Sequence, residues 1–494
     1  MSYGHRSPAT GRMARSRRQE FILNSAGVAS ATSVVRTDLP VAGAELRERQ
    51  LHTGSNASAG AAVDAGRQDR ANCVRAVLLC AAVALLDGFD TQAIAFVAPA
   101  IAQDWRIDAS LFGAVFGAGL LGLMLGSITL GPLADRFGRR AVIIWSTVAF
   151  GAFALLTPLA ADVMTLAVLR FLTGLGLGGA VPNIIALTSE YAPPRVRATL
   201  VTIMYCGFPM GAVVGGLISA PLMSTYGWES VFVVGGLLPI LLAFLLFWAL
   251  PESASFLSRR KSAYEAGMPR SSPSDLQAAT SGKSGLAVRE LMSDGRGFGT
   301  LLLWFIFFAN LLTLYFLVNW LPSLLVRTGF SMSQAIHSLA LLNGAGIVGG
   351  LAIGRLIDRG TPLMALGLSY LLAAVSIVGI SVSAENASWV MTAITFAGMF
   401  VIGAQFGMNA LATTFYPTAV RATGLGWALG VGRLGSFVGP LLGGMLWGLG
   451  WKAQELLFLA AIPSLLAALA VHMLSVIARD PGGKAAGNAT SVAE

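Results

Sequence analysis

Runs of about twenty or more apolar residues recur along most of this 494-residue chain. Such a run is long enough to cross the hydrocarbon core of a bilayer as one helix, which needs about 20 residues. Charged residues make up only 12% of the chain, about half of what a soluble protein carries. The sequence therefore predicts an all-α, multi-pass membrane protein and excludes a soluble one.

Twelve apolar helices are expected, six on each side of a polar stretch. The first six are predicted at residues 74–101, 110–134, 141–161, 163–189, 199–221 and 230–250. The second six are predicted at residues 298–323, 333–355, 363–382, 388–415, 421–446 and 453–477. Residues 74–250 and 298–478 would then form two six-helix bundles. The stretch 251–297, rich in Ser, Gly and basic residues, is expected to be a cytoplasmic linker.

The first 73 residues differ in composition from the rest. They hold ten Arg and six acidic residues among Ser, Ala and Gly, with no sustained apolar run. A segment of this composition cannot bury a core, so residues 1–73 are expected to be a disordered cytoplasmic tail. The only apolar run beside the Arg cluster, residues 21–23, is too short for a signal peptide. Residues 479–494 are expected to be a second cytoplasmic tail.

Basic residues are concentrated in alternate loops. One set of loops carries 15 Lys and Arg residues, whereas the other set carries three, namely Arg106, Arg327 and Lys452. The positive-inside rule then places both termini and the linker in the cytoplasm. Because the charge is spread over tails and loops, it does not form the single basic patch that nucleic acid binding requires.

The two halves of the chain repeat each other. Gly131-Pro-Leu-Ala-Asp135-Arg136 returns as Gly354-Arg-Leu-Ile-Asp358-Arg359, and Tyr191-Ala-Pro-Pro-Arg-Val-Arg-Ala-Thr199 is matched by Tyr416-Pro-Thr-Ala-Val-Arg-Ala-Thr423. Parallel repeats of this kind predict a transporter whose binding site lies between the halves, near the membrane midplane.

The segment Gly131–Arg140 resembles the loop signature of the major facilitator superfamily, and its weaker copy at 354–359 lies where that family has it. The resemblance covers residues 74–478 and implies the major facilitator fold. Three shorter segments resemble the aromatic acid:proton symporters of that superfamily: Asp87-Gly-Phe-Asp90, Arg170-Phe-Leu-Thr-Gly-Leu-Gly176 and Gly432-Arg433. This resemblance implies a monomer in the bacterial inner membrane that imports a small aromatic carboxylate with protons and needs no cofactor.

Four charged residues are predicted deep inside the spans: Asp87, Asp90, Arg170 and Arg433. A charge at the centre of a membrane helix costs about 2.5–3.5 kcal/mol even on the lenient insertion scale, so each should face a cavity or a partner. Asp87 and Asp90 share one helical face, where burial and their like charge favour uptake of a proton. They are the predicted proton-coupling residues. The alternative is that one aspartate pairs with Arg170 or caps a helix break at Gly88.

Arg433 is the predicted substrate anchor, because its guanidinium matches a carboxylate and its glycine neighbours leave room for a ligand. Arg170 is a second candidate, with a purely structural partnership to the aspartates as the alternative. The two acids and two arginines sum to zero charge. A bound carboxylate can therefore be neutralised by one proton on Asp87 or Asp90, although the stoichiometry stays open.

Four uncharged polar residues complete the predicted binding site. Tyr315 and Asn319 share a face of the seventh span, and Gln405 and Asn409 share a face of the tenth. Aromatic rings and amides of this kind suit an aromatic substrate with a few hydrogen-bonding groups. Contact with lipid, for the aromatic residue, and interhelical hydrogen bonding, for the amides, are the alternatives.

The repeated loop motif lies at a membrane boundary and is too far from the midplane to hold substrate. The resemblance to the superfamily implies that it is a conformational gate closed by ion pairs, made of Gly131, Asp135, Arg136, Gly138, Arg139, Arg140, Glu190, Gly354, Asp358 and Arg359. Anchoring by positive charge explains the arginines alone, but it does not explain Asp135 or its recurrence as Asp358.

An enzyme is not expected, because the four histidines are scattered and no nucleophile, base or metal cluster accompanies them. Three alternatives to aromatic acid import stay open. They are drug efflux, transport of another organic anion or a sugar within the same superfamily, and sensing of a solute without transport. The segment Pro251-Glu-Ser253 is similar to one in sugar carriers.

Overall fold

The structure is a computed structural model that describes residues 42–253, 255–258, 290–293, 296–359, 361–382, 386–417 and 420–479. The chain forms two compact units, Met1–Arg67 and Gln68–Glu494. The described part of the first unit is the beginning of helix α2, and the predicted tail before Ala42 lies outside the described residues. Most of the predicted linker and the tail after Arg479 also lie outside them.

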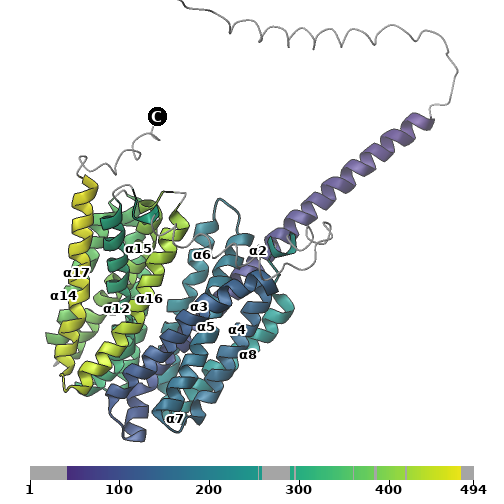
Figure 1. The fold of residues 1–494 in the computed structure, drawn as a ribbon. Coiled ribbons are helices and arrows are strands. Elements are labelled where there is room, and N and C mark those ends of the chain that lie inside the picture. Colours follow the sequence, from purple (N-terminus) through teal and green to yellow (C-terminus); the bar gives the residue numbers. More distant parts are fainter. Residues whose placement is uncertain are drawn as a thin grey trace, which may run out of the picture. The chain divides into compact units, whose positions relative to one another are not determined.

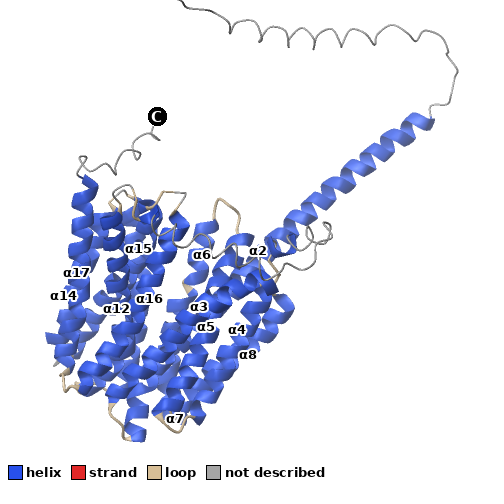
Figure 2. Cartoon of the chain, viewed as in Figure 1, coloured by secondary structure: helices blue, strands red, loops and turns tan. Residues whose placement is uncertain are grey.

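Twelve helical segments of the described chain are long and apolar enough to cross a membrane, which confirms the predicted spans. Figures 1 and 2 show them side by side in the second unit. The first half contains α2 (Ala42–Trp105), α3 (Phe112–Phe137), α4 (Arg139–Leu156), α5 (Val163–Tyr191), α6 (Arg197–Tyr205), α7 (Gly207–Tyr226) and α8 (Glu229–Ala249). The second half contains α12 (Gly297–Arg327), α13 (Met332–Asp358), α14 (Pro362–Val382), α15 (Ala387–Phe415), α16 (Arg421–Gly448) and α17 (Ala453–Arg479).

Local sequence sets several helix starts. Asp162 accepts a hydrogen bond from the backbone N–H of Thr165 at 2.8 Å. This bond lowers the pKa of the exposed Asp162 carboxyl. Ser331 and Gln334 form a reciprocal capping box at the start of α13. Asn386 caps α15 by accepting hydrogen bonds from the backbone N–H groups of Ser388 and Trp389. A short polar side chain thus satisfies backbone donors that would otherwise have no partner at these membrane boundaries.

The fifth predicted span is divided into α6 and α7 at Cys206. Pro209 lacks the N–H that would continue the backbone ladder from α6, and Gly207 and Gly211 allow α7 to pack against α2. A Cβ added at Gly211 would lie 1.8 Å from the carbonyl oxygen of Leu85. The proline therefore interrupts the regular helix, and the glycines let the backbones of α7 and α2 come into direct contact.

Helix packing repeats in the two halves. In the first half α3 packs on α5, while α4 packs on α5 and α8. In the second half the equivalent helices pair in the same way, α13 on α15 and α14 on α15 and α17. The sequence repeat is therefore also a structural repeat.

The two halves meet along a seam that is tight at one end of the bundle. We call the end that carries Arg106, Arg327 and Lys452 the arginine-poor end, and the opposite end the arginine-rich end. Near the arginine-poor end, a Cβ added at Gly113 of α3 would lie 2.8 Å from the Cα of Gly444 of α16. On the other side of the seam, Gly216 of α7 packs against α13 in the same way, with its added Cβ 2.9 Å from the Cβ of Ala340.

A reciprocal amide pair also joins the halves. Gln92 of α2 donates to Asn343 of α13 at 3.1 Å, and Asn343 donates back to Gln92 at 2.9 Å. Both side chains are buried. Each amide satisfies the other, so the pair is stable only while the seam is closed.

The tight seam stops at Arg433. Phe437 and Gly444, one and three turns beyond Arg433 on the same face of α16, contact α3. In the opposite direction, no described atom lies within 4 Å of a Cβ built on Gly430 or Gly426. The described seam is therefore closed at the arginine-poor end and separated on the arginine-rich side of Arg433.

We predict that Gly444→Val opens the seam at the arginine-poor end. Overpacking of this kind costs about 1–3 kcal/mol, which should raise thiol labelling of a cysteine at Ala340 by roughly tenfold. The measurement uses the purified protein with its three native cysteines replaced by serine and Ala340→Cys added. Gly430→Val, on the same face of the same helix but without a neighbour, is the control. Equal labelling of the two variants would contradict the prediction.

Candidate functional site

Asp87 and Asp90 lie on one face of α2 in the interior of the bundle, and they are 1% and 2% exposed. Gly88 lies between them, where a Cβ would come within 1.9 Å of the carbonyl oxygen of Phe208. Helix α2 continues through Gly88 without interruption, so neither aspartate caps a break there. Glycine is needed at this position because α7 packs directly against the α2 backbone.

Asp90 pairs with Arg170 of α5. The Arg170 Nη1 atom lies 3.4 Å from Asp90 Oδ1 and 3.5 Å from Oδ2, and both side chains are buried. The Nη2 atom of Arg170 donates to the Thr157 hydroxyl, and the guanidinium carbon lies 4.7 Å from the centre of the Phe232 ring. All four residues belong to the first half, so this ion pair joins helices within that half.

Asp87 has different surroundings. It accepts a hydrogen bond from the Thr91 hydroxyl at 3.1 Å, and Arg433 of α16, in the other half, lies near enough to act on its charge without forming an ion pair with it. The Arg433 guanidinium lies beside the hydroxyls of Tyr205 of α6 and Tyr315 of α12. The neighbours of Arg433 are therefore one aspartate and one tyrosine of the first half and one tyrosine of its own half.

Sequence reasoning did not single out Tyr205. The sequence signal that could have found it is the pair Gly207 and Pro209, which follow Tyr205 where the span divides into α6 and α7. Irregular backbone at membrane depth is tolerated only where it is buried in protein or lines a cavity.

A small cavity lies between the halves beside Asp90. Its polar lining comes from Asp90 and Thr91 of α2, Arg170 and Thr173 of α5, and Asn319 of α12. The cavity volume available to water is about 30 Å³. This volume suits one or two waters and is too small for an aromatic ring. Asn319 thus reaches the cavity at Asp90, while Tyr315, one turn earlier on α12, reaches Arg433.

The two predicted amides of α15 belong to a chain that also includes Asn310 of α12. Asn310 donates to Gln405 at 2.6 Å, and Gln405 donates to Asn409 at 3.5 Å. Asn310 lies between Phe307 and Leu311, the residues on which Gly432 packs. The amide chain therefore joins α12 to α15 beside the segment of α12 that contacts α16.

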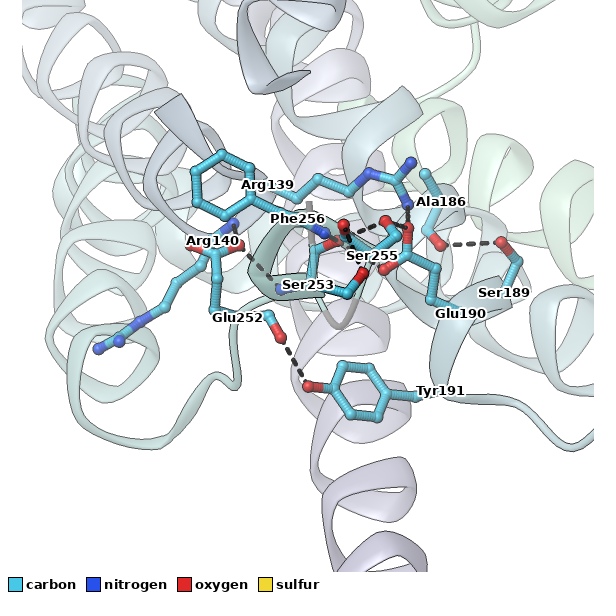
Figure 3. A network of polar contacts seen from close by, with 11 residues as sticks. Arg139, Arg140, Ala186, Ser189, Glu190, Tyr191, Glu252, Ser253, Ser255 and Phe256 are labelled. Carbon is cyan, nitrogen blue, oxygen red and sulfur yellow. Dashed lines mark hydrogen bonds and ion pairs between the residues drawn. The ribbon is translucent and has the colours of Figure 1, made fainter. Parts of the chain in front are cut away.

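At the arginine-rich end, polar side chains join three segments of the first half (Figure 3). Arg139 forms an ion pair with Glu190, which also accepts hydrogen bonds from the hydroxyls of Ser253 at 2.6 Å and Ser255 at 2.7 Å. The end of α5 is thereby tied to the start of α4 and to the segment after α8.

Glu252 forms the second part of this network. Its carboxylate accepts hydrogen bonds from the backbone N–H groups of Arg140 at 3.1 Å and Ser253 at 2.8 Å. The Tyr191 hydroxyl donates to the Glu252 carbonyl at 2.6 Å. Glu252 thus caps the N-terminus of α4 with an anion, which also complements the helix dipole. Sequence reasoning missed Glu252, and the Pro251-Glu-Ser253 motif was the available signal.

Gly138 separates α3 from α4 with φ +94°, and a Cβ there would lie 2.5 Å from Glu252 Oε2. Both the backbone conformation and the carboxylate explain why glycine occupies this position.

The other predicted gate residues are less connected in the described structure. The side chains of Asp135 and Asp358 lie outside the described residues. The Arg136 guanidinium lies over the Phe137 ring, 5.4 Å from its centre, and Arg359 is exposed. A Cβ built on Gly131 would lie 3.5 Å from the Pro182 ring, with no other described neighbour within 4 Å. A Cβ built on Gly354 would have no described atom within 4 Å.

A family model described as Major Facilitator Superfamily matches residues 80–440. The chain belongs to the major facilitator superfamily. It is therefore a member of a family of membrane transporters, not of an enzyme family.

Curated relatives place the chain in the aromatic acid group of this superfamily. It is 42% identical over 416 residues to the 4-hydroxybenzoate transporter PcaK of Pseudomonas putida, covering 82% of this chain and 92% of the relative. It is 41% identical over 398 residues to the 3-(3-hydroxy-phenyl)propionate transporter of Escherichia coli, covering 80% and 92%. The gallate transporter of Pseudomonas putida is 38% identical over 410 residues, covering 80% and 90%.

Solved structures of other superfamily members share the fold. A bacterial homologue of the human lysosomal transporter Spinster matches with a TM-score of 0.65 and 19% identity, covering 82% of this chain and 97% of that one. A D-xylose-proton symporter matches with a TM-score of 0.64 and 16% identity, covering 81% and 97%. These likenesses confirm the major facilitator fold.

We predict that the two aspartates differ in their effect on stability. Asp90→Asn leaves the buried Arg170 charge without its partner, which should cost about 3–5 kcal/mol of folding free energy. Asp87→Asn keeps a hydrogen-bond acceptor for Thr91, and Arg433 keeps two tyrosine partners, so its cost should be much smaller. Thermal unfolding of the purified variants measures the difference. Equal losses in the two variants would contradict the prediction.

We also predict that Glu252→Ala loosens the arginine-rich end of the first half. Loss of the cap on α4 and of the bond to Ser253 should lower the unfolding free energy by about 1–2 kcal/mol. Thermal unfolding again provides the measurement. Glu455→Ala is the matched control, because Glu455 accepts a single backbone hydrogen bond, from Lys452, at the exposed first turn of α17. A larger loss in the control than in Glu252→Ala would show that the network does not stabilise this end.

Proposed function

We propose that this protein imports an aromatic carboxylate together with at least one proton by alternating access. The observation that carries the proposal is the Asp87–Arg433 arrangement, in which an acid and a base from opposite halves lie near each other at the end of the closed seam. The names of the curated relatives, transporters of hydroxybenzoate, hydroxyphenylpropionate and gallate, support an aromatic carboxylate as substrate.

In this proposal the substrate carboxylate binds the Arg433 guanidinium, aided by the hydroxyls of Tyr205 and Tyr315. Asp87 then loses the cation that stabilises its negative charge, and it takes up a proton. Substrate binding and protonation of Asp87 therefore favour each other, because both satisfy charges that are costly within the membrane. The anion and one proton cross as a neutral pair.

We assign Asp90 and Arg170 a different role from that of Asp87 and Arg433. Their ion pair lies within the first half and beside a cavity too small for substrate. We propose that it holds α2 against α5 while the halves move, so that Asp87 keeps its position relative to the seam. Gln405, Asn409 and Asn319 remain proposed contacts for the polar groups of the substrate.

We propose that the arginine-rich end faces the cytoplasm of the bacterial cell, in accordance with the positive-inside rule. The described seam is then closed toward the outside and separated toward the cytoplasm. Opening of the opposite end requires the glycine contacts and the Gln92–Asn343 pair to separate. The Arg139–Glu190–Glu252 network would move with the first half as one body.

Uptake of radiolabelled 4-hydroxybenzoate into cells that express the protein tests this function. We expect uptake that a protonophore abolishes, and a decrease in kcat/KM of about 10- to 100-fold in Arg433→Ala, because hydrogen bonds to a charged group contribute about 1.5–3 kcal/mol. Asp87→Asn should lose accumulation against a gradient while it retains exchange of internal for external substrate. Lys452→Ala, which removes an exposed basic residue, should behave as the wild type.

Other outcomes favour the alternatives. Uptake that survives Arg433→Ala would exclude this residue as the carboxylate anchor. Competition by a sugar but not by benzoate would favour a sugar carrier. Accumulation that increases when a protonophore is added would favour efflux, and binding without any flux would favour a sensor.

A further inference from the structure

Thr91 connects two sites that otherwise have no shared residue in the described structure. Its hydroxyl donates to Asp87 Oδ1 at 3.1 Å, and the same residue lines the small cavity beside Asp90 and Arg170. Because Thr91 lies one turn after Asp87 on α2, the two side chains share a helical face. Thr91 therefore lies between the proposed proton acceptor and the cavity.

The cavity has the size and the polar lining to hold water. Arg170 lines it, is buried, and has an Nε–H group without a hydrogen-bond partner among the described residues. A buried donor left without a partner costs about 1–3 kcal/mol. The space of about 30 Å³ accommodates one or two waters, and Asp90, Thr91 and Asn319 supply the polar partners that a buried water needs.

We propose that Thr91 is a proton relay between this hydrated cavity and Asp87, an inference that rests on the proposed proton-coupled transport. A cavity water donates a hydrogen bond to the Thr91 oxygen. In one concerted step the Thr91 O–H bond breaks as a new O–H bond forms on Asp87, and the water transfers one of its protons to Thr91. The neighbouring water or solvent replaces that proton, so Thr91 ends the step as a neutral hydroxyl.

The charges around the relay determine where the proton stops. Asp90 pairs with Arg170 of the same half, so movement of the two halves against each other does not by itself separate this pair. Asp87 lies near Arg433, and it loses this counter-charge when a substrate carboxylate occupies the guanidinium. The tyrosine hydroxyls beside Arg433, Tyr205 and Tyr315, are neutral donors and do not replace it. The proton is therefore retained on Asp87 when substrate is bound.

Thr91→Val tests the relay, because valine has nearly the same shape and lacks the hydroxyl. We expect the rate of proton-driven uptake to fall by at least about tenfold with KM unchanged, and the solvent deuterium isotope effect on uptake to increase. Exchange of internal for external substrate, which requires no net proton transfer, should stay at the wild-type rate. Thr91→Ser restores the hydroxyl and should restore the uptake rate.

Thr173→Val is the matched control. Thr173 lines the same cavity and is buried, but its hydroxyl donates to the Leu169 carbonyl of its own helix at 2.8 Å. Wild-type uptake rates in Thr173→Val together with slow uptake in Thr91→Val would support the relay. Wild-type rates in Thr91→Val, or slow uptake that Thr91→Ser does not restore, would overturn the relay alone. Wild-type uptake that a protonophore leaves unchanged would overturn the proposed proton coupling and the relay with it.

Discussion

The free energy of a charge inside the bilayer is the constraint on which the rest of this structure depends. Helix α2 carries two aspartates one turn apart, and each lies near a different arginine. Asp90 finds its partner in the same half, whereas Asp87 lies near Arg433 in the other half. Because unpaired charges are costly there, the proposed proton coupling places its switch at the second arrangement, which joins the two halves.

Close backbone contact makes this arrangement possible. Gly88, between the two aspartates, lets the carbonyl of Phe208 approach α2, and Gly113 and Gly444 bring the two halves into contact at the arginine-poor end. Interfaces between membrane helices depend on such small residues, because lipid provides no hydrophobic driving force for association. Besides these glycines and the amide pair, the rings of Phe116 of α3 and Trp320 of α12 also meet across the seam.

The arginine-rich end of the first half follows a different principle. There the carboxylates of Glu190 and Glu252 collect hydrogen bonds from hydroxyls and backbone N–H groups of three segments. This network holds three segments of the first half together at the end where the seam is separated. Rigid halves and a separable seam are the two properties that alternating access requires.

Sequence alone determined the twelve spans, the repeat of the halves and the four charges within the spans, because hydropathy and the cost of charge in lipid depend on composition and position along the chain. It left open which acid would pair with which arginine, since residues three apart on one helix face cannot be assigned to partners on other helices. Tyr205, Asn310 and Glu252 gained their contacts only through packing of distant segments. Tertiary structure decided these pairings because they depend on the distances between helices, which no local pattern encodes.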